Sequence, residues 1–285
     1  MWKARLCLGT DADFGIPIEE QIRLFRQVGF DGFFTEWSEA ADISGWRRLA
    51  DSLHITYQSV HAPFGRADAL WQEGTAAECA VEELLACLKD CAKNEIPIMV
   101  MHAFIGFGQH TPTAAGIENF KKIADAADRL GVKIALENTE GEEYLAALME
   151  AFRGYEQVGF CWDSGHEMCY NHAQDLLAAY GDRLLCTHLN DNLGIRDFSG
   201  EITWRDDLHL LPFDGIADWA EIARRLHRCG YSGDLTLELI KTSKPGRHEN
   251  DAYAAMSMEE YVTEAYKRGC RIAALKLRED KAAGV

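Results

Sequence analysis

The sequence contains no apolar run that approaches the roughly 20 residues needed to cross a membrane. Its first residues include Lys3 and Arg5 but few apolar residues before Asp11, so the apolar core of a signal peptide is missing. Linkers, low-complexity tracts and repeats longer than one strand–helix unit are also missing. These absences predict a cytoplasmic protein with one domain over residues 1–285 and no membrane partner.

Positive charge is scarce as well. The chain has 29 Lys and Arg against 46 Asp and Glu, which gives a formal net charge of −17. Such a surface repels a polyanion at long range, and no basic stripe with interleaved aromatic residues is present to oppose that repulsion. A nucleic-acid partner is therefore disfavoured, although an acidic enzyme with a local basic groove is not excluded by net charge.

The nine cysteines are odd in number and fall mostly inside apolar segments, as Cys7, Cys161 and Cys186 do. This usage predicts buried thiols rather than a disulfide framework. Cys87 and Cys91 lie one helical turn apart, a spacing that fits helix packing better than a metal site. With 47% hydrophobic residues, the chain has enough apolar side chains for a large core.

Apolar runs alternate with amphipathic runs along the chain. The predicted strands cover residues 4–9, 32–37, 56–61, 97–102, 132–137, 158–163, 184–188 and 234–238. The predicted helices cover residues 17–28, 43–54, 76–94, 113–130, 145–152, 175–180, 216–229 and 257–277. Eight such units predict an α/β protein with a closed (β/α)8 TIM barrel, whose active site lies at the carboxyl ends of its strands. A doubly wound open sheet is the alternative, but it would spread the strand ends along a row.

Six of the predicted strands end in a residue able to bind a metal ion. These are His61, His102, Glu137, Asp163, His188 and Glu238. Neighbouring strands lie about 4.8 Å apart, so the last four ends in a barrel converge on one point. Three carboxylates and one imidazole suit one divalent ion of Mn, Co, Mg or Zn, and they leave the site near −1, which favours a neutral polyol or keto-sugar. Taken singly, each residue is more often part of a structural ion pair.

Five motifs together resemble a known family. They are Leu136–Thr139, Trp162–His166, His188–Asp191, Asp206–Gly215 and Leu237–Leu239. The chain resembles, over nearly its whole length, the xylose isomerase-like TIM-barrel superfamily of sugar isomerases and epimerases. That resemblance implies Glu137, Asp163, His188 and Glu238 as metal ligands. It also implies that Glu137 and Glu238 transfer the proton alpha to a carbonyl that the metal polarises, through an enediolate.

The resemblance also implies a pocket for a small sugar. The candidate substrate-binding residues are His166, His61, His102, Asp207, His209, Arg196, Trp37 and Phe64. Phe104, Phe107 and Trp204 are further aromatic candidates, each of which is more often core or rim packing. Several sugar epimerases carry a substrate-binding arginine six residues after the position of His188. Here that residue is Gly194, so their sugar specificity does not transfer.

Three other functions stay open. Apurinic endonucleases of the same superfamily bind three zinc ions, and this chain has a matching residue at all nine ligand positions: His61, His102, Glu137, Asp163, His166, His188, Asp207, His209 and Glu238. However, Cys7–Asp13 lacks the Gly-x-His opening of those enzymes. An inosose dehydratase-like lyase and a non-catalytic sugar-binding protein are the other two. The resemblance suggests a homodimer or homotetramer.

Overall fold

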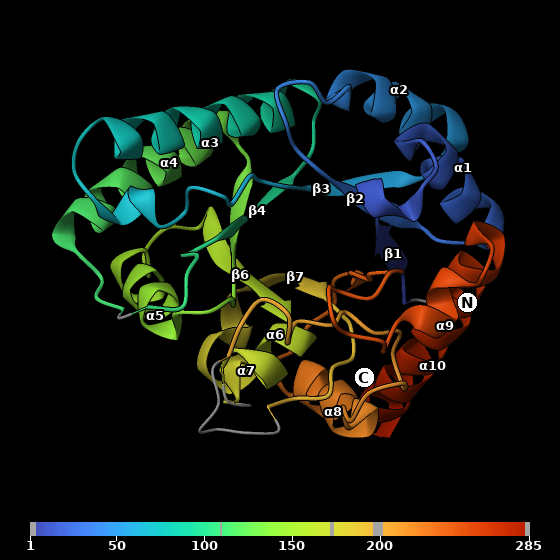
Figure 1. The fold of residues 1–285 in the computed structure, drawn as a ribbon. Coiled ribbons are helices and arrows are strands. Elements are labelled where there is room, and N and C mark those ends of the chain that lie inside the picture. The colour runs from blue at the N-terminus through green and yellow to red at the C-terminus, as the bar shows by residue number, and fades with distance from the viewer. Residues whose placement is uncertain (1–3, 109, 172–173, 196–201, 283–285) are drawn as a thin grey trace.

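Eight parallel strands form a ring at the centre of the molecule (Figure 1). The computed structural model describes residues 4–108, 110–171, 174–195 and 202–282. The strands are β1 (Leu6–Gly9), β2 (Gly32–Glu36), β3 (Thr56–His61), β4 (Ile98–His102), β5 (Lys133–Glu137), β6 (Val158–Asp163), β7 (Leu184–His188) and β8 (Leu235–Leu237). They pair in the order β7-β6-β5-β4-β3-β2-β1-β8.

The ring nearly closes between β7 and β8, where Leu189 connects the two. Its N–H donates to Thr236 O at 2.8 Å, and its carbonyl accepts from Glu238 N at 3.3 Å. The predicted (β/α)8 barrel is therefore confirmed, and all six ligand-type strand ends lie at one end of it.

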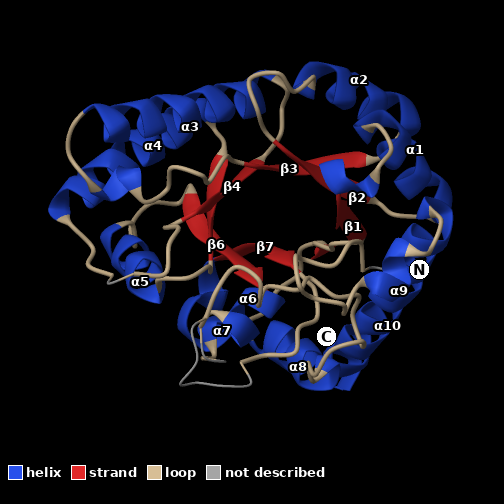
Figure 2. Ribbon diagram, viewed as in Figure 1, coloured by secondary structure: helices blue, strands red, loops and turns tan. Residues whose placement is uncertain are grey.

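Helices surround the ring of strands (Figure 2). They are α1 (Ile18–Val28), α2 (Ile43–Leu53), α3 (Thr75–Lys93), α4 (Ala114–Leu130), α5 (Glu142–Ala151), α6 (Ser164–Cys169), α7 (Leu176–Tyr180), α8 (Trp219–Arg228), α9 (Asp251–Ala254) and α10 (Met258–Ala282). In α8, Ile222 and Leu226 are four residues apart and buried, whereas Arg228 is exposed. This apolar stripe explains why the helix packs on the barrel.

Two of the described α-helices, α6 and α9, were not predicted. Helix α6 begins directly after β6 because the Asp163 carboxylate caps it, accepting from His166 N at 2.6 Å. The short α9 precedes α10, which continues to Ala282 rather than ending near residue 277. Strand β8 is shorter than predicted, so Glu238 lies just beyond its last residue.

The barrel interior contains a small apolar cluster of Val100, Ala135, Cys161 and Cys186, all fully buried. A larger core fills the space between strands and helices. All nine cysteines are free thiols, as predicted. No described helix has both the length and the apolar composition required to cross a membrane.

Candidate metal centre

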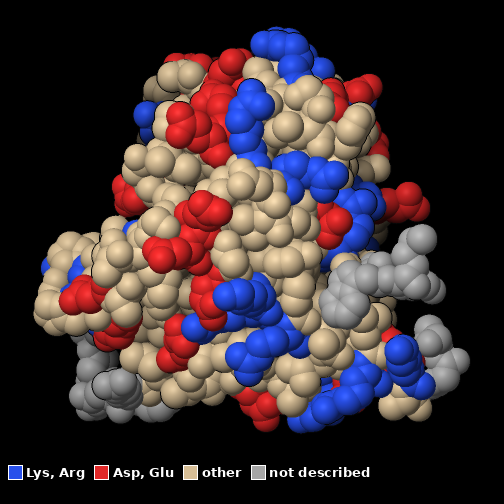
Figure 3. Space-filling model, turned by 90° about the vertical axis from the view of Figure 1, so that its right-hand side faces the viewer, with Lys and Arg blue, Asp and Glu red and all other residues tan. Residues whose placement is uncertain are grey.

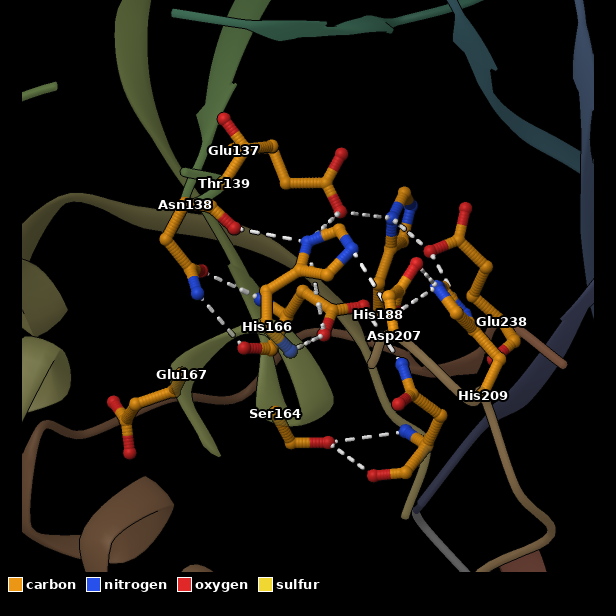
Figure 4. Close-up of polar contacts among 12 residues, drawn as sticks. Glu137, Asn138, Thr139, Ser164, His166, Glu167, His188, Asp207, His209 and Glu238 are labelled. Atoms are coloured by element: carbon orange, nitrogen blue, oxygen red, sulfur yellow. Dashed lines mark hydrogen bonds and ion pairs between the residues drawn. The ribbon is translucent and has the colours of Figure 1, made fainter. Parts of the chain in front are cut away.

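The four residues predicted to bind metal converge at the carboxyl ends of β5 to β8. One ligand atom from each of Glu137, Asp163, His188 and Glu238 lies within 4.8 Å of the others. His188 Nδ1 is central, at 2.9 Å from Glu137 Oε1 and 3.3 Å from Glu238 Oε2 (Figure 4). Glu137, Asp163 and His188 are fully buried, whereas the Glu238 side chain is 21% exposed. The centre is therefore closed on the barrel side and open at Glu238.

The charges of the centre are strongly coupled. Burial alone would raise the pKa of Glu137, but His188 and His61 hold it well below its usual range. Burial likewise opposes the effect of His188 on Glu238, whose pKa is lowered to about 2. Burial would lower the pKa of His188, yet Glu238 and Glu137 raise it well above its ordinary value. Without a metal, these shifts favour anionic glutamates beside a protonated His188, which must lose its proton to bind an ion.

Among the three carboxylates of the centre, Asp163 is stabilised least by nearby positive charge. Burial raises its pKa to about 7, against the opposing effect of His166 and His209, while Glu238 and Glu137 raise it further. A buried anion close to two other anions needs a cation. The donor set of three carboxylates and one imidazole, all within reach of one point, fits a divalent ion.

Neighbouring amides fix the orientation of Asp163. Asn190 Nδ2 donates to Asp163 Oδ2 at 2.7 Å, and Ser164 Oγ holds the Asn190 backbone at both its N–H and its carbonyl. The Asn138 side chain accepts from Asp163 N at 2.8 Å and donates to Asp163 O at 2.9 Å. Asn138 and Asn190 lie within the motifs noted in the sequence, but their role was not predicted.

We expect Asn190→Ala to weaken divalent-metal binding by about 10- to 100-fold, because groups that orient a ligand typically have effects of this size. Isothermal titration calorimetry with MnCl2 would measure the change. Asn119→Ala is the matched control, since Asn119 is a buried amide on α4 that donates to Leu70 O and Gln72 O, far from Asp163 in the contacts it makes. Equal metal affinity in the two variants would contradict the orienting role of Asn190.

Two pairs of histidines flank the centre. His61 Nε2 and His102 Nε2 lie 3.1 and 3.5 Å from Glu137 Oε2. On the other side, Asp207 Oδ1 is 3.5 Å from His166 Nε2 and 2.9 Å from His209 Nε2. Ligand atoms of His61, His102 and Glu137 form one compact group, and those of Asp163, His166 and His209 form another.

The ring nitrogens of three flanking histidines are arranged alike. Nδ1 lies 2.9 Å from Ala62 O in His61, 2.9 Å from Asn138 O in His166 and 3.1 Å from Glu238 O in His209. A backbone carbonyl at one ring nitrogen turns the other nitrogen toward a carboxylate. Metal-binding histidines commonly have this arrangement. Eight of the nine ligand-type residues of the sequence thus fall into three adjoining groups, and the ninth, Asp207, contacts His166 and His209.

A cavity of about 560 Å³ opens above these groups. Six of the predicted substrate-binding residues line it: His61, Phe64, His102, His166, Asp207 and His209. Glu238 also lines it, whereas Glu137, Asp163 and His188 lie beneath its surface. Burial lowers the pKa of His102 to about 3, so this histidine is neutral where it meets the cavity.

The other two predicted substrate-binding residues are Trp37 and Arg196. Trp37 is buried outside the cavity lining, and its indole N–H donates to Asp90 Oδ2 at 2.9 Å. The physical reason is strand alternation: Glu36 lines the cavity, so the next side chain points the opposite way. We therefore correct the prediction for Trp37. Arg196 lies outside the described residues.

Some cavity residues were not predicted. Tyr170 follows α6 and lies 5.1 Å from the ring of His166. Lys244 donates to Asp207 Oδ2 at 3.1 Å, whereas Lys241, three residues earlier, donates to Ala254 O and does not line the cavity. Tyr170 and Lys244 lie outside helices and strands, where no periodic pattern of apolar residues marks a position. For Lys244, the only signal in the sequence is that it follows Glu238 closely.

A family model described as xylose isomerase-like TIM barrel matches residues 15–261. The chain belongs to this xylose isomerase-like TIM barrel family. The family match agrees with the resemblance noted in the sequence and with the position of the metal-binding candidates at the strand ends.

One curated relative is the uncharacterized protein y4fM of Sinorhizobium fredii (strain NBRC 101917 / NGR234). It is 33% identical over 147 residues, which cover 48% of this chain and 44% of that protein. The chain thus matches less than half of the length of this relative.

Several solved structures share the fold of this chain. The IOLI protein with a bound zinc atom has a TM-score of 0.74 and 17% identity, covering 95% of this chain and 98% of that one. An L-ribulose 3-epimerase has a TM-score of 0.72 and 15% identity, with 99% and 98% coverage. D-psicose 3-epimerase from Clostridium cellulolyticum H10, with D-tagatose, has a TM-score of 0.67 and 14% identity, with 94% and 99% coverage. At these identities the likeness establishes the fold alone.

Proposed function

We propose that this family member is a divalent-metal-dependent isomerase or epimerase of a small keto-sugar or polyol-derived ketone. The observation that carries the proposal is the pair Glu137 and Glu238, which meet at His188 Nδ1 at the base of the cavity. Epimerases among the solved relatives are consistent with this chemistry, although their sugars are not transferred to this chain.

The residues of the centre would divide the proton transfer as follows. A divalent ion held by Glu137, Asp163, His188 and Glu238 would stabilise negative charge on the substrate carbonyl oxygen. Glu238 borders the cavity and is anionic, so it is placed to remove the proton alpha to that carbonyl. Glu137 lies deeper and would first take a proton from the His61 imidazole beside its Oε2. It would then give this proton to the intermediate, at the opposite face of the same carbon in an epimerisation or at the adjacent carbon in an isomerisation. His166 and His209 line the wall, where they would hold substrate hydroxyls.

The cavity supports a small substrate. Its volume of about 560 Å³ falls in the range of about 300–1,000 Å³ that is typical of small-molecule sites. Carboxylates of Asp11, Glu36 and Glu140 border it, and Lys244, the one lysine among the described residues of its lining, is paired with Asp207. This balance favours hydroxyl groups over a phosphate.

Solvent-hydrogen exchange tests the proposal directly. Manganese-loaded protein would be incubated in deuterated water with a panel of ketohexoses and ketopentoses, and NMR would follow the hydrogen alpha to the carbonyl. We expect deuterium at that carbon in at least one sugar, because the intermediate exchanges its proton through a glutamate. Absence of exchange across the panel, with metal bound, would reject the proposal.

The flanking histidines support a second candidate, which is phosphoester hydrolysis with three metal ions. The orientation of His61, His166 and His209 is the specific observation in its favour. The charge of the molecule favours it less, since the net charge is −17 and the basic groups on the face in Figure 3 are interrupted by acidic and uncharged side chains. A net negative charge without a continuous basic surface weakens binding to a polyanion.

Metal content separates the two candidates. Elemental analysis of protein purified without chelator or a metal-binding tag should give about one ion per chain for the isomerase or epimerase. A value close to three zinc ions, falling to two in His102→Ala, would instead support the hydrolase, and abasic DNA would be the next substrate.

A further inference from the structure

Exposed aromatic side chains gather at the mouth of the cavity. Phe64, Phe107 and Trp204 are 38%, 42% and 50% exposed, and all three line the cavity. In the part of the chain that the structure describes, they are three of only five large hydrophobic residues with such exposure. Large apolar groups left in water around one opening mark a binding site.

Each of these aromatics is connected to the polar base of the cavity. Phe64 stacks on His102, with ring centroids 4.4 Å apart and an interplanar angle of 16°. Phe107 meets the edge of Tyr170 at 5.7 Å, and Tyr170 in turn lies against His166. The aromatics therefore lie one layer outward from the histidines of the base.

Trp204 completes the layer on a third side. Its ring centroid is 5.7 Å from Lys244 Nζ, which donates to Trp204 O at 2.8 Å and to Asp207 Oδ2 at 3.1 Å. Lys244 thus ties the indole to the carboxylate that His166 and His209 contact. The cavity has an ionisable base and an aromatic outer part, and one ligand would span both.

We propose that the outer part is a subsite for a planar, uncharged ring joined to the sugar, as in an aryl glycoside or a nucleoside. This inference rests on the proposed function for the inner part only. Aromatic side chains on three sides offer faces and edges to a flat ring. The acidic lining from Asp11, Glu36 and Glu140 disfavours a phosphorylated ligand.

Matched ligand pairs test the subsite. Isothermal titration calorimetry would compare 4-nitrophenyl and methyl β-glycosides of D-glucose, D-galactose and D-xylose on the metal-loaded protein, with adenosine and D-ribose as the nucleoside pair. We expect at least one ring-bearing member to bind about tenfold or more tightly than its partner, because stacking of one ring on aromatic side chains has effects of this size. The arm that shows the difference identifies the kind of ring.

Variants locate the effect. Phe107→Ala and Trp204→Ala should each remove about tenfold of the affinity for the ring-bearing ligand and change that of its ring-free partner by less than about twofold. Leu130→Ala is the control, because Leu130 is 40% exposed on α4 and is not part of the cavity lining. It should leave both affinities unchanged.

Three results would overturn the subsite: equal affinity within every pair, no binding of any ring-bearing ligand, or full ring affinity in the double variant Phe107→Ala/Trp204→Ala. The proposed function has a separate readout, since hydrogen exchange with simple keto-sugars does not require a ring. Exchange without ring preference would reject the subsite alone, and ring binding without exchange would reject the reaction alone.

Discussion

Glu238→Gln is expected to lower the rate of keto-sugar turnover by about 10²- to 10⁴-fold, the usual contribution of a general acid or base. The amide has nearly the same shape, but it cannot accept the alpha proton at neutral pH. It also removes one of the anionic oxygens near His188, so the affinity for the metal falls as well. Steady-state assay at saturating manganese separates the loss of the base from the loss of metal.

Glu137→Gln should be equally inactive for a different reason. Glu137 is fully buried and contacts His61 and His188, so the loss of its charge removes the counterion of His61 and one of the two carboxylates beside His188. Glu142→Gln is the matched control, since Glu142 lies on α5 outside the cavity lining and should keep full activity. Retained alpha-hydrogen exchange in both the Glu137 and Glu238 variants would contradict the two-glutamate mechanism.

The barrel and the convergence of its candidate ligands were predictable because they depend on local patterns. Parallel strands buried on both faces are read as short apolar runs, and a polar residue at the end of such a run stands out. Glu137, Asp163 and His188 each follow such a run directly. Since a barrel brings its strand ends together, the convergence of these side chains followed from the topology.

Other features depend on contacts that the pattern does not contain. Glu137 is fully buried, with His61 and His102 in contact with its carboxylate, whereas the Glu238 side chain is 21% exposed and borders the cavity. Trp37 was misplaced because its chemistry suggested a sugar-binding face, whereas strand alternation directs it toward Asp90. Lys244 lies in a loop, where sequence spacing does not indicate direction.

The orientation of the flanking histidines was equally beyond the sequence. Residue types alone place His61, His166 and His209 near the centre, but the choice of ring nitrogen depends on Ala62, Asn138 and Glu238 carbonyls. This choice bears on function, because a nitrogen turned toward a carboxylate can hold a metal or a substrate hydroxyl.

The stabilisation by metal should increase as the pH rises from about 5 to 9. Burial raises the pKa of folded Asp163 to about 7 from an ordinary value of 3.8, so its bound proton stabilises the metal-free fold less and less as the pH rises from about 4 to 7. Burial opposes but does not cancel the effect of Asp207 on His209, whose pKa rises from 6.5 to about 9. Its stabilising charge is complete below about pH 6.5 and is lost as the pH rises through 9.

Asp163 and His209 therefore both make the metal-free protein less stable with increasing pH. Glu238, with a pKa of about 2, contributes a constant amount of stability between about pH 5 and 9. A bound divalent ion replaces the protons as the compensating charge, and it competes with them less at high pH. Calorimetric melting with manganese and with chelator at pH 5 to 9 should show a Tm difference that widens with pH. In Asp163→Asn the Tm difference should be small at every pH, because the substitution removes both a candidate ligand and the carboxyl group that titrates. A Tm difference that narrows with pH in the unaltered protein would show that a metal does not neutralise these carboxylates.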